Sequence, residues 1–210
     1  MLNNHGFDLW SESYDHSVKQ AESANQYPFA GYTALMNTAY GTIMHAAPAK
    51  VLDLGFGTAL LTAKLYAGGN TITGLDFSAK MLKIAAAKMP EAELLQWDFT
   101  RGLPPALDGR RFDFIVSTYA LHHLTDDAKP GFVAALLDLL EPSGTLLIGD
   151  VCFPTREAHD GCKAACGEGW DESEHYFVFD ALQEALAHRC RLAFHAFSFC
   201  AGIIEIRKPS

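Results

Sequence analysis

Basic residues are scarce in this sequence. Its 210 residues include 16 Lys and Arg against 25 Asp and Glu, which gives a formal net charge of −9 at pH 7. Proteins bind nucleic-acid phosphates mainly through Lys and Arg, and no basic run or arm is present here. We therefore expect no nucleic-acid partner.

Long apolar runs are lacking as well. No uninterrupted apolar stretch approaches the roughly 18 residues of a membrane-spanning helix. The first residues, MLNNHGFDLW, lack the cationic start and apolar stretch of a signal peptide. These absences predict a soluble cytoplasmic protein that has no membrane partner.

The cysteines form no compact disulfide pattern, and five is an odd number, so we expect reduced thiols. His159, Cys162 and Cys166 fall on one helical face by their spacing, but only His175 offers itself as a fourth metal ligand. Cysteine in a helix is more often a small buried apolar residue. We predict no metal site.

What the sequence does contain is a glycine turn after a short buried segment, VLDL. Gly55 and Gly57 let the backbone turn tightly and approach a ligand without a Cβ in the way. A second apolar run ends at Asp76, about 20 residues later, where the second strand of a βαβ unit presents a carboxylate to ribose hydroxyls. Asp76 could instead cap a helix, although Ser78 is available for that role. The pairing predicts a nucleoside-cofactor site.

Asp53 separates this turn from an ordinary dinucleotide motif. It stands two residues before Gly55, where a dinucleotide would bring its pyrophosphate, and a carboxylate there favours a cation over an anion. The third glycine of the dinucleotide pattern is replaced by Leu60. S-adenosylmethionine, which carries an ammonium and a sulfonium but no phosphate, fits these residues better than NAD.

The chain resembles the class I S-adenosylmethionine-dependent methyltransferases over residues 8–207. Five stretches carry the resemblance in order: VLDLGFGTALLTAKL, GLDFSAKML, LLQWDFT, FDFIVSTYALHHL and SGTLLIGD. The segments FDLWSESYDHSV and QYPFAGY are similar to a small, poorly characterised bacterial family of methyltransferases. One departure is Ala59, where the family often has glycine; it costs little if its φ is negative. The resemblance implies methyl transfer but no particular acceptor.

The resemblance also assigns roles at the cofactor site. Asp53 binds the ammonium, Asp76 the ribose hydroxyls and Asp98 the adenine amino group. The full set of expected cofactor-binding residues is Tyr14, Asp53, Gly55, Gly57, Asp76, Phe77, Met81, Asp98, Phe99 and Ser117. The hydroxyl of Tyr14 is expected near the cofactor carboxylate, although Trp10, Tyr14 and Val18 could equally form a core stripe. Asp98 could instead belong to a surface turn.

We expect one α/β domain over residues 1–210, a doubly wound, seven-stranded and mostly parallel sheet of Rossmann-like methyltransferase type whose last strand is antiparallel. Helices 8–19 and 29–46, within residues 8–46, are expected to form a lid, and Asp126 is expected to cap helix 127–140. The strands are predicted at 50–54, 71–75, 93–97, 112–118, 144–151, 190–199 and 201–208, the last two as a hairpin. The other helices are predicted at 58–67, 79–88, 154–168 and 179–188.

The predicted function is transfer of a methyl group from S-adenosylmethionine to a small-molecule acceptor, leaving S-adenosylhomocysteine. The alternatives are a noncatalytic S-adenosylmethionine-binding regulator and an NAD-dependent oxidoreductase, and the oligomeric state is left open. His122 and His123 could supply a general base or could simply pack the following helix, so no catalytic residue is assigned. Aromatic candidates for an acceptor wall are Tyr27, Phe29, Trp170, Tyr176 and Phe177.

Overall fold

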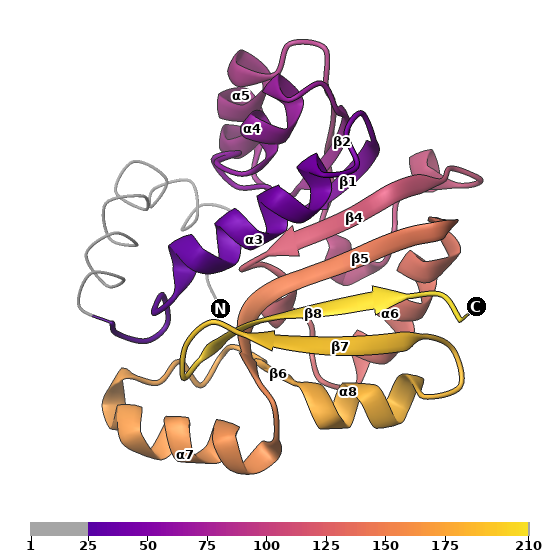
Figure 1. Cartoon of the computed structure of the whole chain (residues 1–210). Helices are drawn as coiled ribbons and strands as arrows, with labels where there is room; N and C mark the ends of the chain where they lie inside the picture. The colour runs from indigo at the N-terminus through magenta and orange to yellow at the C-terminus, as the bar shows by residue number, and fades with distance from the viewer. Residues whose placement is uncertain (1–24, 210) are drawn as a thin grey trace.

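The computed structural model describes residues 25–209, which form a sheet with helices on both faces (Figure 1). The strands are β1 (Lys50–Leu54), β2 (Thr71–Asp76), β3 (Glu93–Gln96), β4 (Phe112–Thr118), β5 (Leu140–Phe153), β6 (Phe177–Val178), β7 (Arg191–Ala196) and β8 (Ala201–Arg207). The α-helices are α3 (Tyr32–Met44), α4 (Thr62–Ala67), α5 (Ala79–Lys88), α6 (Ala128–Asp138), α7 (Arg156–Cys166) and α8 (Phe179–Leu186).

The strand order is β3-β2-β1-β4-β5-β8-β7, and β6 pairs with β5 outside this path. Strand β8 runs antiparallel to both of its neighbours, β5 and β7, while the other pairings are parallel. The predicted seven-stranded sheet with an antiparallel last strand is therefore confirmed. Strand β6 was not predicted, because two residues are too few to show the alternation of apolar and polar residues that marks a strand.

Alternating strand residues build a core on each face of the sheet. Val51 of β1 and Leu147 of β5 pack in the core that includes buried residues of α3, α4 and α5. The next residue of β1, Leu52, packs in the core on the opposite face, which includes buried residues of α6 and α8. Figure 1 shows α3 across one face of β4 and β5. Burial on both faces explains why these strands read as continuous apolar runs.

The start of α4 and the cap of α6 differ from prediction. Helix α4 begins at Thr62, because Gly57 and Ala59 have left-handed backbone with φ of +53° and +61°, which a right-handed helix does not accommodate. Alanine at position 59 was expected to cost little stability if its φ were negative. Its φ is positive, so this expectation is not met. Helix α6 follows Asp127, which makes no side-chain cap, and the predicted cap Asp126 instead accepts a hydrogen bond from Lys129 Nζ at 2.7 Å.

The order reverses between β1 and β4. From β1 the chain proceeds to β2 and β3 on one side, and from β4 it proceeds to β5 on the other. The loops after these two strands diverge and leave a crevice at the carboxyl ends of the strands. Within residues 25–209, no helix has the length and apolar character needed to cross a membrane. Tyr14 and the predicted helix 8–19 lie outside the described residues.

Candidate active site

A cavity of about 420 Å³ lies at this crevice. Its lining comes from the loops after β1, β2 and β4, the N-terminal end of α3, and the segment that precedes β6. The two ends of the lining differ in chemistry. We call the part of the lining formed by the glycine turn, Asp53 and Asp76 the cofactor end, and the part formed by Tyr27, Tyr176, His122, His123 and Glu174 the acceptor end.

The two glycines of the turn have different roles. Both have positive φ, +72° at Gly55 and +53° at Gly57. A Cβ at Gly55 would lie 2.4 Å from the Cβ of Ala120, so the packing of the β4 loop excludes any side chain there. A Cβ at Gly57 would meet nothing within 4 Å among the described residues. Gly57 therefore leaves bare backbone on the cavity surface, open to a ligand.

Asp53 is a buried carboxyl group in the cavity lining, with 1% of its surface exposed. Its Oδ2 accepts a hydrogen bond from Thr62 Oγ1 at 2.5 Å, and within residues 25–209 no group donates to Oδ1. Burial raises the pKa of Asp53 to about 7, the bond from Thr62 opposes this rise, and the charge of Asp76 adds to it. A cation beside Oδ1 would stabilise the ionised group.

Asp76 ends β2, next to β1, and holds the glycine turn in place. Its Oδ2 accepts a hydrogen bond from the backbone N–H of Gly57 at 2.9 Å, and its Oδ1 accepts one from Ser78 N–H at 2.9 Å. Ser78, not Asp76, caps α5 by accepting from Met81 N–H. These two bonds tie the end of β2 to the glycine turn and to the start of α5.

The other predicted cofactor residues divide into two groups. Phe77, Met81 and Phe99 line the cavity beside Asp76. Asp98 is exposed and is not part of the lining; its carboxylate accepts from the N–H and hydroxyl of Thr100. Ser117 is buried behind the lining, and its hydroxyl donates to the carbonyl of Leu54 at 2.8 Å. The end of β4 and the loop after it are represented in the lining by Thr118, Tyr119, Ala120, His122 and His123.

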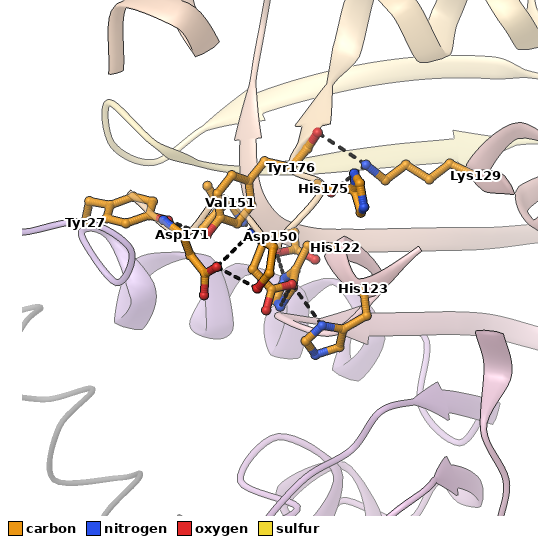
Figure 2. A network of polar contacts seen from close by, with 11 residues as sticks. Tyr27, His122, His123, Lys129, Asp150, Val151, Asp171, His175 and Tyr176 are labelled. Atoms are coloured by element: carbon orange, nitrogen blue, oxygen red, sulfur yellow. Dashed lines mark hydrogen bonds and ion pairs between the residues drawn. The ribbon is translucent and has the colours of Figure 1, made fainter. Parts of the chain in front are cut away.

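At the other end of the cavity the histidine pair meets two carboxylates (Figure 2). His122 Nδ1 lies 2.6 Å from Asp150 Oδ1, and His123 Nδ1 lies 2.9 Å from Glu174 Oε2. Burial lowers the pKa of His122, but the charge of Asp150, the hydrogen bond to it and the charge of Glu174 together raise the pKa above its ordinary value. Asp150 was not among the predicted site residues, although it is an acid three residues before the end of a buried strand, β5, and Asp76 was predicted from a similar position in β2.

Tyrosines form the wall beside the histidines. Tyr27, Phe29 and Tyr176 line the cavity, and the hydroxyls of Tyr27 and Tyr176 are hydrogen-bonded to each other. Burial raises the pKa of both hydroxyls, which keeps them neutral. Trp170 is buried behind the wall and stacks on Tyr27 at a centroid distance of 5.1 Å. The fifth candidate, Phe177, packs in the core under α6 and α8 and is not part of the lining.

Lys129 of α6 anchors the segment that carries Glu174. Its side chain is buried, and Nζ donates to the carbonyls of His175 at 2.5 Å and Tyr176 at 3.2 Å (Figure 2). The backbone N–H of His175 donates to the carbonyl of His122 at 2.9 Å. Burial lowers the pKa of Lys129, and the bond and charge of Asp126 oppose this. The anchor fixes Glu174 against the histidine loop.

Replacing Lys129 with Met should lower the free energy of unfolding by about 2 to 3 kcal/mol, because two buried carbonyls lose their donor. Urea denaturation measures this change. The matched control is Lys163→Met, whose ammonium pairs with Glu172 on the surface and should matter by less than about 0.5 kcal/mol. Equal midpoints for the two variants would contradict the anchoring role.

The helical face of His159, Cys162 and Cys166 is partly packed in the core around Trp170. The ring of His159 lies edge-on to Trp170 at 5.2 Å, and its Nδ1 lies 2.7 Å from Asp160 Oδ1. Burial raises the pKa of Cys162 to about 12, with the neighbouring Cys166 adding to the rise. Cys162 is buried among apolar side chains, with Cys166 packed against the same core, as the apolar interpretation predicts.

Known methyltransferases are similar to this chain in sequence. Residues 51–144 match a family model described as a methyltransferase domain. An uncharacterized methyltransferase of Geobacillus thermodenitrificans is 36% identical over 201 residues, which cover 91% of this chain and 87% of that protein. The chain belongs to this family of methyltransferases. The predicted enzyme class is thereby confirmed.

Solved structures with low sequence identity share the fold of this methyltransferase. A TehB-like SAM-dependent methyltransferase from Corynebacterium glutamicum has a TM-score of 0.60 at 19% identity, covering 95% of this chain and 98% of that chain. Magnesium protoporphyrin IX methyltransferase from Synechocystis, with bound SAH, has a TM-score of 0.65 at 16% identity, covering 86% and 84%. At such identities the likeness shows the fold alone, and it confirms the predicted Rossmann-like methyltransferase fold.

Proposed function

We propose that this methyltransferase transfers the methyl group of S-adenosylmethionine to a small, mainly apolar acceptor bound in the same cavity. The observation that carries the proposal is that one cavity is lined first by a glycine turn with Asp53 and Asp76, and second by tyrosines, two histidines and Glu174. The first end suits a cationic nucleoside, and the second suits a planar molecule beside it.

The cofactor end fits S-adenosylmethionine in charge and in shape. Asp53 offers a buried Oδ1 to which no described residue donates, which suits the ammonium, and the bare backbone at Gly57 leaves room for the methionine or ribose portion. Asp76 is placed to accept from ribose hydroxyls, with Phe77, Met81 and Phe99 around the adenine. The pyrophosphate of NAD would meet the charge of Asp53, which disfavours the oxidoreductase alternative.

The acceptor end argues for a small molecule. Tyr27, Phe29 and Tyr176 present ring surfaces to the cavity, and the whole volume of about 420 Å³ must hold both reactants. The net charge of −9 works against a polyanionic acceptor such as a nucleic acid. Cytoplasmic location and the absence of nucleic-acid and membrane partners stay predictions.

The residues of the chain contribute mainly alignment and exclusion of water. Bound S-adenosylmethionine supplies an electrophilic methyl group on a sulfonium that leaves as a neutral thioether. The protein must then hold the acceptor atom in line with the methyl carbon, and such alignment contributes up to several kcal/mol to the rate. The buried lining around Asp53 and Tyr119 keeps water from the reaction path.

Ligand binding tests the cofactor part of the proposal. S-adenosylmethionine and S-adenosylhomocysteine, at about 100 times their dissociation constants, should each stabilise the protein by about 2.7 kcal/mol, seen as a rise of several degrees in Tm. NAD at the same concentration should cause no shift. Stabilisation by NAD alone would contradict the assignment.

Turnover tests the acceptor part. Release of S-adenosylhomocysteine is measured with a panel of small planar alcohols, amines, thiols and acids, with a protein lysate and a nucleic-acid extract as comparison acceptors. Turnover confined to small molecules supports the proposal, and turnover confined to either macromolecular fraction overturns it. Cofactor binding without turnover on any acceptor would instead favour the regulatory alternative.

A further inference from the structure

Three side chains at the acceptor end lie close enough to share one metal ion. His122, His123 and Glu174 each offer one ligand atom, and these atoms lie within 4.8 Å of one another. The histidines come from the loop after β4 and Glu174 from the segment before β6, so the group exists only in the folded chain. All three residues line the cavity.

The separations suit a first-row divalent cation. Glu174 Oε2 is 2.9 Å from His123 Nδ1 and 3.7 Å from His122 Nε2. A tetrahedral cation with ligands at about 2.1 Å holds neighbouring ligand atoms about 3.4 Å apart. The two observed distances lie on either side of this value, so small rotations of the side chains would bring them to it.

Asp150 supplies the support that metal-bound histidines usually have. Its carboxylate is 1% exposed, and Oδ1 accepts from His122 Nδ1 at 2.6 Å and from Val151 N–H at 2.8 Å. A carboxylate can only accept here, so Nδ1 carries the proton, and Nε2, which lies 3.7 Å from Glu174 Oε2, is left as the coordinating nitrogen. This arrangement orients a histidine ligand and increases its basicity.

The charges around the group favour a cation. Asp150 and Glu174 supply two carboxylates. The one nearby ammonium within the described chain that affects His122 is Lys129, and it is bound to Asp126 and to the carbonyls of His175 and Tyr176. Two imidazoles and one carboxylate are ligands that Zn²⁺ accepts readily, whereas Mg²⁺ prefers oxygen alone.

We propose that His122, His123 and Glu174 form a binding site for one Zn²⁺ ion at the acceptor end of the cavity. The protein supplies three ligands and leaves a fourth position open to the cavity, as in catalytic zinc sites. An acceptor with an oxygen or nitrogen donor can take that position, an extension that rests on the proposed function. His122 then acts as a metal ligand through Nε2 and not as a general base.

Zinc binding is measured first on the whole native protein. After dialysis against a chelator, the protein is titrated with Zn²⁺ alone by calorimetry, and with Co²⁺ alone while visible absorption is followed. We expect one Zn²⁺ per chain with micromolar or tighter affinity, and the intense visible bands of tetrahedral Co²⁺. Absence of binding at micromolar concentrations would overturn the proposal.

Variants then locate the ion. Glu174→Gln and His123→Gln should each weaken Zn²⁺ binding by tenfold or more, and Asp150→Asn, which removes the negative charge behind His122 but leaves an oxygen that can accept from Nδ1, by about tenfold. The control is His195→Gln, since the side chain of His195 is about half exposed, lies 3.7 Å from Glu205 and is not part of the cavity lining. Unchanged affinity in both ligand variants would mean that the ion binds elsewhere, which contradicts the site.

Two further measurements keep the test decisive. If a ligand variant does not fold, the rise in Tm caused by Zn²⁺ in the native protein is compared with that in His195→Gln, and the absorption of the Co²⁺ form reports nitrogen ligation directly. S-adenosylmethionine binding and turnover are measured on the chelator-treated protein. If protein that binds no zinc shows full turnover, the proposed zinc site is wrong and the proposed function stands. If the protein binds zinc but does not bind S-adenosylmethionine, the zinc site stands and the proposed function is wrong.

Discussion

Replacing Asp53 with Asn is expected to make the cofactor-free protein more stable above pH 7. Burial raises the pKa of Asp53 from its ordinary value of 3.8 to about 7. Between these values the folded protein keeps a proton that the unfolded chain has lost, so stability falls as pH rises. Asp53→Asn has no such carboxyl group, so its free energy of unfolding should exceed that of the wild type by about 3 kcal/mol at pH 8 and by less near pH 4. Urea denaturation at both pH values measures this difference.

The same variant should bind S-adenosylmethionine more weakly. Losing a charge-assisted hydrogen bond to the cofactor ammonium costs about 2 kcal/mol, or about thirtyfold in Kd. The wild-type protein must ionise Asp53 to bind, so its affinity should fall about tenfold from pH 7 to pH 5.5, and the fall should be absent in Asp53→Asn. Calorimetry at the two pH values measures both effects.

Asp113→Asn is the matched control for these measurements. Asp113 accepts from the backbone N–H of Lys50 at 2.8 Å near the opposite ends of the strands, and an asparagine oxygen can still accept that bond. Its stability and cofactor affinity should stay close to wild type. If the Asp53→Asn protein bound S-adenosylmethionine at pH 7 as tightly as the wild type, the cofactor ammonium would not bind at Asp53.

Gly55→Ala should mainly lower stability, whereas Gly57→Ala should mainly weaken cofactor binding. At Gly55 the new methyl group would overlap Ala120 and adopt a positive φ, costing about 3 to 5 kcal/mol of stability, or about 10 °C in Tm. At Gly57 only the backbone cost of about 1 to 2 kcal/mol applies, because the space is open. The Gly57 methyl group would instead enter the cavity and weaken cofactor binding about tenfold or more.

Gly109→Ala separates backbone strain from occupation of the cavity. Gly109 has a φ of +72°, a Cβ there meets nothing within 4 Å among the described residues, and it is not part of the cavity lining. Its loss in Tm should resemble that of Gly57→Ala, while its cofactor affinity should equal wild type. If Gly57→Ala also bound the cofactor normally, the cradle assigned to Gly57 would be wrong.

Short-range signals were enough to predict most of the sheet and to bring Asp53, the glycine turn and Asp76 to one place in it. The apolar runs at 50–54 and 71–75 are flanked by Gly55 and Asp76, and each of these features lies within one βαβ unit of the chain. In parallel strands the carboxyl ends meet at one edge, so adjacent strands bring these residues together without further information.

Side-chain direction was less predictable. Ser117 closes β4 as expected, but alternation along the strand turns its hydroxyl to the carbonyl of Leu54 rather than to the cavity. Asp98 follows β3 as expected, yet its carboxylate binds Thr100 in a local turn. For both, the sequence located the residue on the chain, while local hydrogen bonding determined its contacts.

The sequence by itself determined the reaction family, the fold and the acidic glycine turn, because each depends on residues close together in one strand, one loop or one repeating period. Only the tertiary structure brought Glu174 to His122 and His123, supported them with Asp150, and buried Lys129 beneath the segment that carries Glu174. These residues are separated by long stretches of chain and share no pattern of spacing. Their proximity arises from the packing of β5, α6 and the segment before β6, which depends on the whole core.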